Sequence, residues 1–257
     1  MDRIQYEIEL EREINKAINS CYPHSWDEDL ITHELLKSLG SFFNSNSFSD
    51  NLYRETKIRF TAYKLRGKAE TEYGDIAFLT SIRFDNGIEF KGVANFEAKK
   101  RLKNDFNYQK ESRKDQYKTI SDNKPYSQLL LYDYEPISQH IKPILYIDEW
   151  NRFYRDNPFR QLISQCVCFP LYMVADGTRV NRNDNSISRT MSEQLCRRIF
   201  YGIDLHLDKE SIQDITNFDS KNHPKFVVDI EVTHGNTSIT DDNINRGALN
   251  DLYERLK

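Results

Sequence analysis

Apolar residues in the first 45 positions recur at helical intervals. Within residues 1–20, isoleucines are spaced among glutamate and arginine residues so that one side of a helix is apolar. These isoleucines are Ile4, Ile8, Ile14 and Ile18. A second apolar pattern follows the acidic run Asp27-Glu28-Asp29, which is typical of a helix start, and it ends at Gly40. We therefore expect an amphipathic helix over residues 1–20 and a second helix that stops at Gly40.

From residue 55 the apolar spacing changes to the alternation of a β-strand. Three such segments follow one another, over residues 55–65, 71–84 and 88–100. A turn at Arg66-Gly67-Lys68 separates the first two segments. Asp85-Asn86-Gly87 separates the last two and is a strong short-range hairpin signal. The pattern predicts a meander of three consecutive antiparallel strands.

Beyond residue 100 the pattern predicts further helices and strands. Residues 103–121 carry an apolar stripe that includes Tyr117 and Ile120, which indicates a helix packed on the sheet. Residues 126–134 form a short apolar run flanked by prolines, which is typical of a buried strand. The remaining expected elements are helices over 144–154, 186–205 and 247–256 and strands over 166–177 and 225–235.

This order of elements predicts a mixed α/β (α+β) protein with a central mixed β-sheet flanked by helices. Residues 1–135 would hold the N-terminal helices and the core with the β-meander. Residues 136–257 would supply the remainder of the core and a C-terminal elaboration. The two segments could equally form one continuous domain, because a single large core can accommodate 257 residues.

Composition indicates a folded, polar protein. The chain is 38% hydrophobic and 30% charged, its mean hydropathy is -0.74, and its 12% aromatic content argues against disorder. No apolar stretch approaches the roughly 20 residues of a membrane span, and the acidic start of the chain is unlike a signal peptide. We expect a cytoplasmic protein without membrane contact, whose cysteines are buried free thiols. These cysteines are Cys21, Cys166, Cys168 and Cys196.

Charge is unevenly distributed along the chain, although the formal net charge is only -4. Between Tyr53 and Lys118 there are 16 lysine and arginine residues against 10 aspartate and glutamate residues, which leaves 20 against 30 elsewhere. A polyanion such as nucleic acid could be attracted to this basic middle third. An ordinary solvated surface with random clustering of charge explains the same counts.

The second and third expected strands carry charged residues where a sheet interior is ordinarily apolar. Asp75 lies in the second strand, and Glu97 and Lys99 lie two positions apart in the third. Because side chains alternate across a strand, Glu97 and Lys99 share one face at a spacing of roughly 6 to 7 Å. If Asp75 faces the same side, two carboxylates converge beside one ammonium group. A hard cation such as Mg²⁺ would relieve the repulsion between the carboxylates.

This arrangement resembles the PD-(D/E)xK phosphodiesterases, the restriction-endonuclease-like nucleases, over residues 27–135. Asp75 matches the first acid of the motif, and Glu97-Ala98-Lys99 matches its second half. Glu34 falls where the family often has a helix acid, whereas Gly74 departs from the proline of the motif. The resemblance implies a restriction-endonuclease-like core.

The resemblance also implies a metal-dependent reaction. Mg²⁺, with Mn²⁺ as an alternative, would be held by Asp75, Glu97, Glu34 and the backbone carbonyl of Ala98. The catalytic set would be Asp75, Glu97, Glu34 and Lys99. Lys99 would orient the attacking water and offset charge in the transition state. The implied function is a Mg²⁺-dependent endonuclease, with DNA favoured over RNA, in restriction or anti-phage defence.

Four residues after the motif are candidate nucleic-acid contacts. Lys100, Arg101 and Lys103 form a basic run that could hold phosphates. Gln116, on the helix expected next, could steady the site or the substrate. A lysine-rich helix start can also be plain surface.

Simpler interpretations exist for the same residues. Glu97 and Lys99 could form a solvated salt bridge, and Asp75 could accept a hydrogen bond in a turn. Glu55-Thr56-Lys57 repeats the Glu-x-Lys pattern without an acid in a preceding strand, so the pattern alone is weak evidence. The alternative functions are a catalytically silent binding or scaffold subunit of a defence complex and an RNA-cleaving nuclease. The assembly could be a homodimer or include partner subunits.

Overall fold

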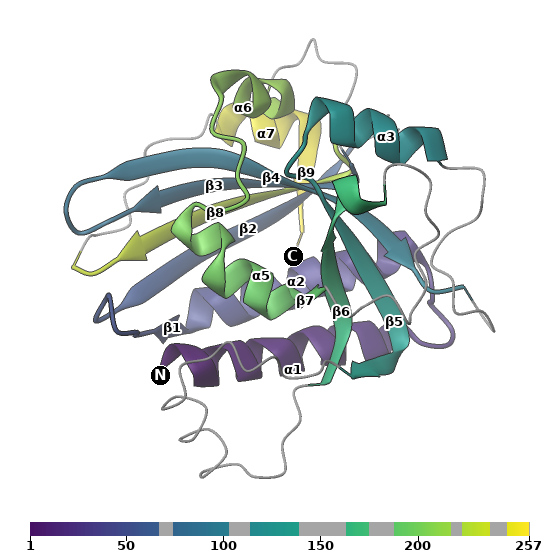
Figure 1. Ribbon diagram of the computed structural model, residues 1–257, viewed down its shortest axis with the longest axis horizontal. Helices are drawn as coiled ribbons and strands as arrows, with labels where there is room; N and C mark the ends of the chain where they lie inside the picture. The colour runs from purple at the N-terminus through teal and green to yellow at the C-terminus, as the bar shows by residue number, and fades with distance from the viewer. Residues whose placement is uncertain are drawn as a thin grey trace.

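The computed structural model describes most of the chain and places a nine-stranded mixed sheet at its centre (Figure 1). The described residues are 1–66, 74–102, 114–138, 163–174, 188–216, 223–236 and 246–256. The strands are β1 (Ser47–Phe48), β2 (Thr56–Leu65), β3 (Ile76–Arg83), β4 (Glu89–Lys100), β5 (Gln128–Ser138), β6 (Ile163–Pro170), β7 (Arg189–Thr190), β8 (Phe226–His234) and β9 (Tyr253–Arg255). Their order across the sheet is β1-β2-β8-β3-β4-β5-β6-β7, with β9 paired to β2.

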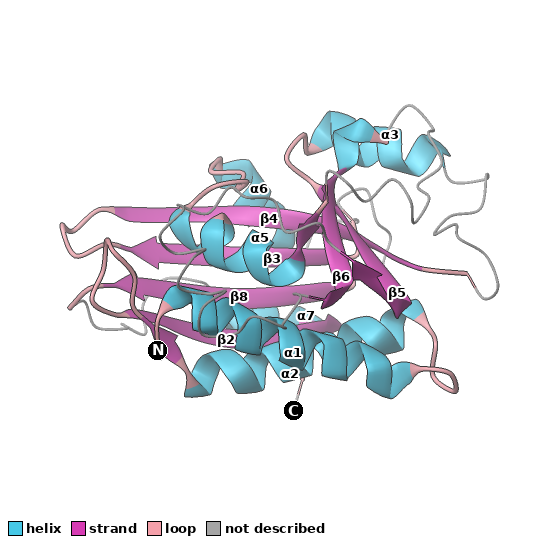
Figure 2. Cartoon of the chain, turned by 60° about the horizontal axis from the view of Figure 1, so that its bottom comes forward, coloured by secondary structure: helices cyan, strands magenta, loops and turns pink. Residues whose placement is uncertain are grey.

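Helices cover both faces of this sheet (Figures 1 and 2). The helices are α1 (Arg3–Cys21), α2 (Glu28–Ser45), α3 (Lys114–Asn123), α5 (Met191–Arg197), α6 (Lys209–Thr216) and α7 (Arg246–Leu252), with 3₁₀ turns η2 (Leu171–Met173) and η4 (Ile199–Tyr201). The largest core cluster lies between the sheet and α1, α2 and α5, whereas α3, α6 and α7 pack on the opposite face. The predicted mixed α/β class with a central mixed sheet flanked by helices is therefore confirmed.

The hairpin of β3 and β4 forms as the sequence predicts, with Ile82 opposite Phe90 in antiparallel register. Its turn places Gly87 at a φ of 82°, a conformation that glycine adopts without steric cost. The expectation of three consecutive antiparallel strands is wrong, however. β8 lies between β2 and β3, antiparallel to the former and parallel to the latter. Strands from both halves of the chain therefore contribute to one sheet.

Several element boundaries also differ from the predicted ones. α2 continues past Gly40 to Ser45, and a Cβ atom at Gly40 would lie 3.4 Å from the ring of Phe60, so this glycine faces β2 inside the helix instead of ending it. The helix expected over 186–205 is confined to α5, followed by the turn η4, and the terminal helix gives way to β9. The strand expected over 166–177 ends at Pro170, while the strand expected over 225–235 forms as β8. The helix expected over 144–154 and residues 103–113 lie outside the described residues.

Two further expectations concern the whole chain. The four cysteines are free and buried, as predicted. Among the helices in the described parts of the chain, none combines the length and apolar character needed to cross a membrane.

Helix α1 buries two carboxylates that its amphipathic pattern does not predict. Because α1 packs against α5 as well as α2 and the sheet, Glu7 and Glu11 are enclosed along with its apolar side. The guanidinium of Arg197 donates to both carboxylate oxygens of Glu7 at 2.7 to 3.0 Å. Glu11 Oε2 accepts a long bond, 3.3 Å, from the backbone N–H of Ser192, Oε1 has no hydrogen-bond partner among the described residues, and burial raises the pKa of Glu11 to about 7. Glu11 is therefore the weakly compensated member of this pair.

We predict that Glu11→Gln flattens part of the pH dependence of stability. Between its unfolded pKa, about 4.5, and about 7, the native state holds a proton on Glu11 that the unfolded chain has lost. Wild-type stability should consequently fall as pH rises through that window, by at most about 3 kcal/mol from this group. Urea unfolding from about pH 5 to about pH 8 should show Glu11→Gln gaining stability relative to wild type as pH rises. Glu13→Gln, on the outer side of α1, is the control and should show no such gain.

Candidate active site

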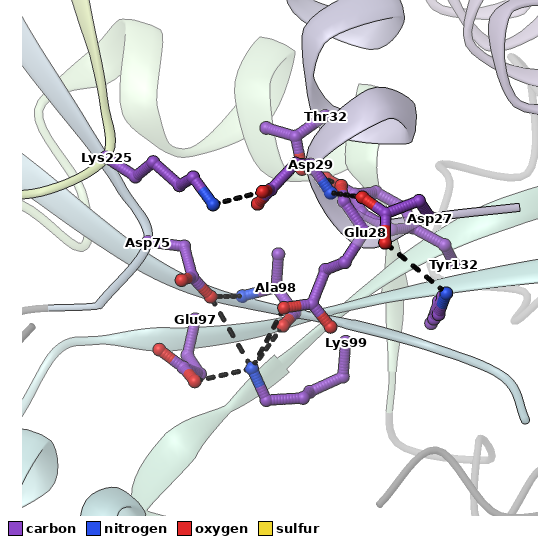
Figure 3. Close-up of polar contacts among 11 residues, drawn as sticks. Asp27, Glu28, Asp29, Thr32, Asp75, Glu97, Ala98, Lys99, Tyr132 and Lys225 are labelled. Atoms are coloured by element: carbon purple, nitrogen blue, oxygen red, sulfur yellow. Dashed lines mark hydrogen bonds and ion pairs between the residues drawn. The ribbon is translucent and has the colours of Figure 1, made fainter. Parts of the chain in front are cut away.

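The start of β3 and the end of β4 bring Asp75, Glu97 and Lys99 together (Figure 3). The backbone N–H of Asp75 donates to the carbonyl of Phe96 at 2.9 Å, which fixes the two strands at this point. Phe96 and Ala98 pack into the core on the α1 and α2 face, so the alternating Glu97 and Lys99 face the other side. Asp75 faces that side as well, and its Oδ2 lies 3.5 Å from Lys99 Nζ.

Gly74 explains why the chain departs from proline before Asp75. The φ of Gly74 is 91°, which proline cannot adopt. A Cβ atom at this position would also lie 2.7 Å from the carbonyl oxygen of Phe96. Glycine therefore permits the close approach of β3 and β4, and the backbone N–H of Ala98 donates to Asp75 Oδ2 at 2.9 Å.

The ammonium group of Lys99 lies among four oxygen atoms (Figure 3). It is 2.5 Å from Glu97 Oε1 and 2.5 Å from the carbonyl oxygen of Ala98. It is 3.4 Å from Glu28 Oε1 and 3.5 Å from Asp75 Oδ2. Three carboxylates and one carbonyl thus converge on a single positive charge that is almost fully buried.

Glu28, and not the predicted Glu34, is the helix acid that reaches this cluster. The two residues are six positions apart on α2, so their side chains point about 120° apart around the helix axis. Glu34 is exposed and lines a groove between α1 and α2 together with Lys16 and Lys37. In the sequence, Glu28 belongs to the acidic run at the start of the helix. Such a run is as typical of an ordinary helix N-terminus as of a functional site.

All three acids of that run pair with lysines around the site. Asp27 Oδ2 lies 3.8 Å from Lys100 Nζ, and Glu28 contacts Lys99 as described. Asp29 forms an ion pair with Lys225, the residue directly before β8. The sequence pattern does not indicate Lys225, because it lies next to Asp75 only through the insertion of β8 beside β3.

Burial sets the protonation of the cluster. Glu97 is fully enclosed, and burial, together with the charge of Asp75, raises the pKa of Glu97 to about 8. Burial alone would lower the pKa of Lys99, but Asp75, Glu97 and Glu28 outweigh it and raise that pKa above its ordinary value. The ammonium therefore stays charged and is the counter-ion of the carboxylates.

One oxygen of the cluster has no partner. Glu97 Oε2 is buried and has no hydrogen-bond partner among the described residues, and Oε1 contacts Lys99 as an ion pair without hydrogen-bond geometry. An unpaired buried carboxylate oxygen is costly and suits a ligand that supplies positive charge.

The donor set fits Mg²⁺. Within the described ranges, no three His, Cys, Asp or Glu side chains converge closely enough to form a complete metal site. Mg²⁺ does not require one, because it is usually held by one or two carboxylates plus waters and other oxygens. Asp75, Glu97, Glu28 and the carbonyl of Ala98, whose oxygens all lie around the Lys99 ammonium, could provide these ligands.

The candidate nucleic-acid contacts divide into different environments. Lys100 is half-buried, and its Nζ donates to the carbonyl of Trp26 at 2.5 Å. Arg101 is buried, donates to Asp133 at 3.0 Å and to Glu135 at 2.8 Å, and so ties β4 to β5 instead of presenting its guanidinium to solvent.

The other two predicted contacts follow β4 in the chain. Lys103 lies outside the described residues. Gln116 is half-buried on α3 beside Tyr117, which is close enough to Lys99 to influence its pKa.

Comparisons with known proteins add no relative: no family model, no curated protein and no solved structure matches the chain. Fold and site together define a mixed α/β protein whose nine-stranded sheet carries a buried carboxylate–lysine cluster.

We predict that Lys99→Met destabilises the protein by about 3 kcal/mol, the usual scale for removing one partner of a buried ion pair. The loss follows because Asp75 and Glu28 would lose the positive charge that they face, and the buried Glu97 would lose its ion-pair partner. Urea unfolding near neutral pH measures the change. Lys100→Met, at the adjacent half-buried position, is the matched control, and an equal loss in both variants would contradict a special role for the Lys99 ammonium.

Proposed function

We propose that this protein is a Mg²⁺-dependent endonuclease of the PD-(D/E)xK type that hydrolyses phosphodiester bonds of nucleic acid, DNA in preference to RNA. The observation that carries the proposal is the convergence of Asp75, Glu97, Glu28 and the carbonyl of Ala98 on the Lys99 ammonium. The motif resemblance extends the proposal to a restriction-endonuclease-like core and to a role in restriction or anti-phage defence. Mn²⁺ would be an alternative to Mg²⁺.

The residues divide the work of hydrolysis as follows. Asp75, Glu97, Glu28 and the Ala98 carbonyl would hold the cation, which when bound supplies Lewis-acid activation of the phosphate and of the attacking water. Lys99 would donate hydrogen bonds to that water or to a phosphate oxygen and so offset the charge that builds in the transition state. The water oxygen would bond to phosphorus and give up a proton to solvent, one ester P–O bond would break, and the departing oxygen would take a proton from solvent.

One observation favours a second candidate, a catalytically silent binding module. The Lys99 ammonium already balances much of the negative charge of the cluster, so the fold does not need a cation for its stability. In such a protein the acids and the lysine would be structural groups.

Cleavage of supercoiled plasmid DNA in Mg²⁺ tests the proposal. We expect nicking and linearisation by wild type, stopped by chelation with EDTA. Asp75→Asn and Lys99→Met should each lower the rate by about 100-fold or more, because each removes a charge aimed at the reacting groups. Circular dichroism checks that the variants are folded. A folded wild type that binds nucleic acid without cutting it would favour the binding module, and competition with a matched RNA would rank the two substrates.

A second prediction separates Glu28 from Glu34. Glu28→Gln should lower the cleavage rate by about 10- to 100-fold, since its carboxylate reaches the cluster. Glu34→Gln should cleave at the wild-type rate, because Glu34 lies on another side of α2. The same plasmid assay measures both variants, and the reverse ranking would place the site at the groove between α1 and α2.

A further inference from the structure

We propose that Lys225 is a phosphate-binding residue beside the candidate active site, and that Asp29 pairs with its ammonium group until a phosphodiester displaces the carboxylate. The inference rests on the proposed function in one respect, that a nucleic acid is the ligand. It adds a contact that lies in neither the Glu-x-Lys motif nor the basic run after it.

The sheet places Lys225 next to Asp75. Leu65 donates its N–H to the carbonyl of Lys225, and Phe226 donates its N–H to the carbonyl of Asp75, both at 2.9 Å. Phe226 packs into the core on the α2 side, and the side chain of Lys225, directly before it, reaches Asp29 at the start of α2. Figure 3 shows the ammonium group of Lys225 directed at Asp29, at the start of α2, with Asp75 nearby.

Exposure distinguishes Lys225 from Lys99 and Lys100, the other lysines of the site among the described residues. The Lys99 side chain is 4% exposed and belongs to the buried cluster, whereas that of Lys225 is 31% exposed. Lys100 is 27% exposed, but its Nζ also donates to the carbonyl of Trp26. Lys225 is therefore the lysine that a ligand arriving from solvent can most readily reach.

The pair between Asp29 and Lys225 is suited to exchange. Asp29 is 41% exposed, and ion pairs with this much exposure contribute little to stability because water screens them. Asp29 also lies in the first turn of α2, where the helix dipole favours a carboxylate even without a lysine partner. A phosphate group that replaced Asp29 would thus gain the ammonium at small cost to the helix, with the release of counter-ions from the nucleic acid.

Another acid–lysine pair on the sheet provides a matched control. Glu55 and Lys57 lie 3.0 Å apart on and beside β2, with side chains about half exposed. Neither residue belongs to the site described above. Neutralising them removes the same charges as neutralising Asp29 and Lys225, without touching the neighbourhood of Asp75.

The test is binding of a fluorescein-labelled DNA duplex, with a matched RNA duplex as a second arm, followed by fluorescence anisotropy in EDTA. Between about 50 and 200 mM KCl, Lys225→Gln should reduce the slope of log affinity against log salt by about 1. Asp29→Asn should tighten binding several-fold more than Glu55→Gln does, because it frees the ammonium. In the double variant Asp29→Asn/Lys225→Gln that extra gain should disappear.

Each outcome has a defined meaning. The inference is overturned if Lys225→Gln behaves like Lys57→Gln, or if the gain from Asp29→Asn persists in the double variant. When plasmid cleavage is intact in such a case, the proposed function stands without the inference. Binding through Lys225 without any cleavage would instead support the inference and refute the enzyme. Absence of binding by wild type to either duplex at low salt would overturn the inference, and the plasmid assay in Mg²⁺ would decide the proposed function independently.

Discussion

The candidate site depends on one interaction, the burial of the Lys99 ammonium among carboxylates from three elements. Asp75 comes from the start of β3, Glu97 from β4 and Glu28 from α2. Without a positive charge, the buried Glu97 and the partly exposed Asp75 would repel each other when ionised, and the close pairing of β3 and β4 there would be less stable. The lysine makes an acidic cluster compatible with the interior of the sheet.

The parts of this arrangement that depend on neighbouring residues could be predicted from the sequence. The turn Asp85-Asn86-Gly87 fixes the hairpin of β3 and β4, and alternation along β4 puts Glu97 and Lys99 on one face. Both follow from the geometry of a strand and a tight turn, without knowledge of the rest of the chain. For the same reason the first helix was predictable, although the burial of its glutamates was not, since that depends on α5 packing against it.

The parts that depend on distant residues could not be predicted. Nothing in residues 55–84 shows that β8 will lie between β2 and β3, because strand pairing over 150 positions or more leaves no local pattern. Lys225 was missed for this reason. The choice of Glu34 over Glu28 has a different cause: periodicity locates a helix but does not say which of its polar residues meets a neighbouring sheet. Gly74 shows the opposite case, a departure from the motif that backbone geometry explains.

The start of α2 links the two halves of the proposed chemistry. Asp27, Glu28 and Asp29 would favour the N-terminus of any helix, so their presence is unremarkable alone. What distinguishes this helix is that each acid meets a lysine of the site, from β4 or from the residue before β8. A cation would compete for the carboxylates, and a phosphodiester would compete for the ammonium groups. A cation alone would leave the lysines without partners, and a phosphodiester alone would leave the carboxylates without partners. Both ligands together would give each group a partner. Under the proposed function, metal and nucleic acid should therefore bind cooperatively, because each stabilises the charges that the other releases.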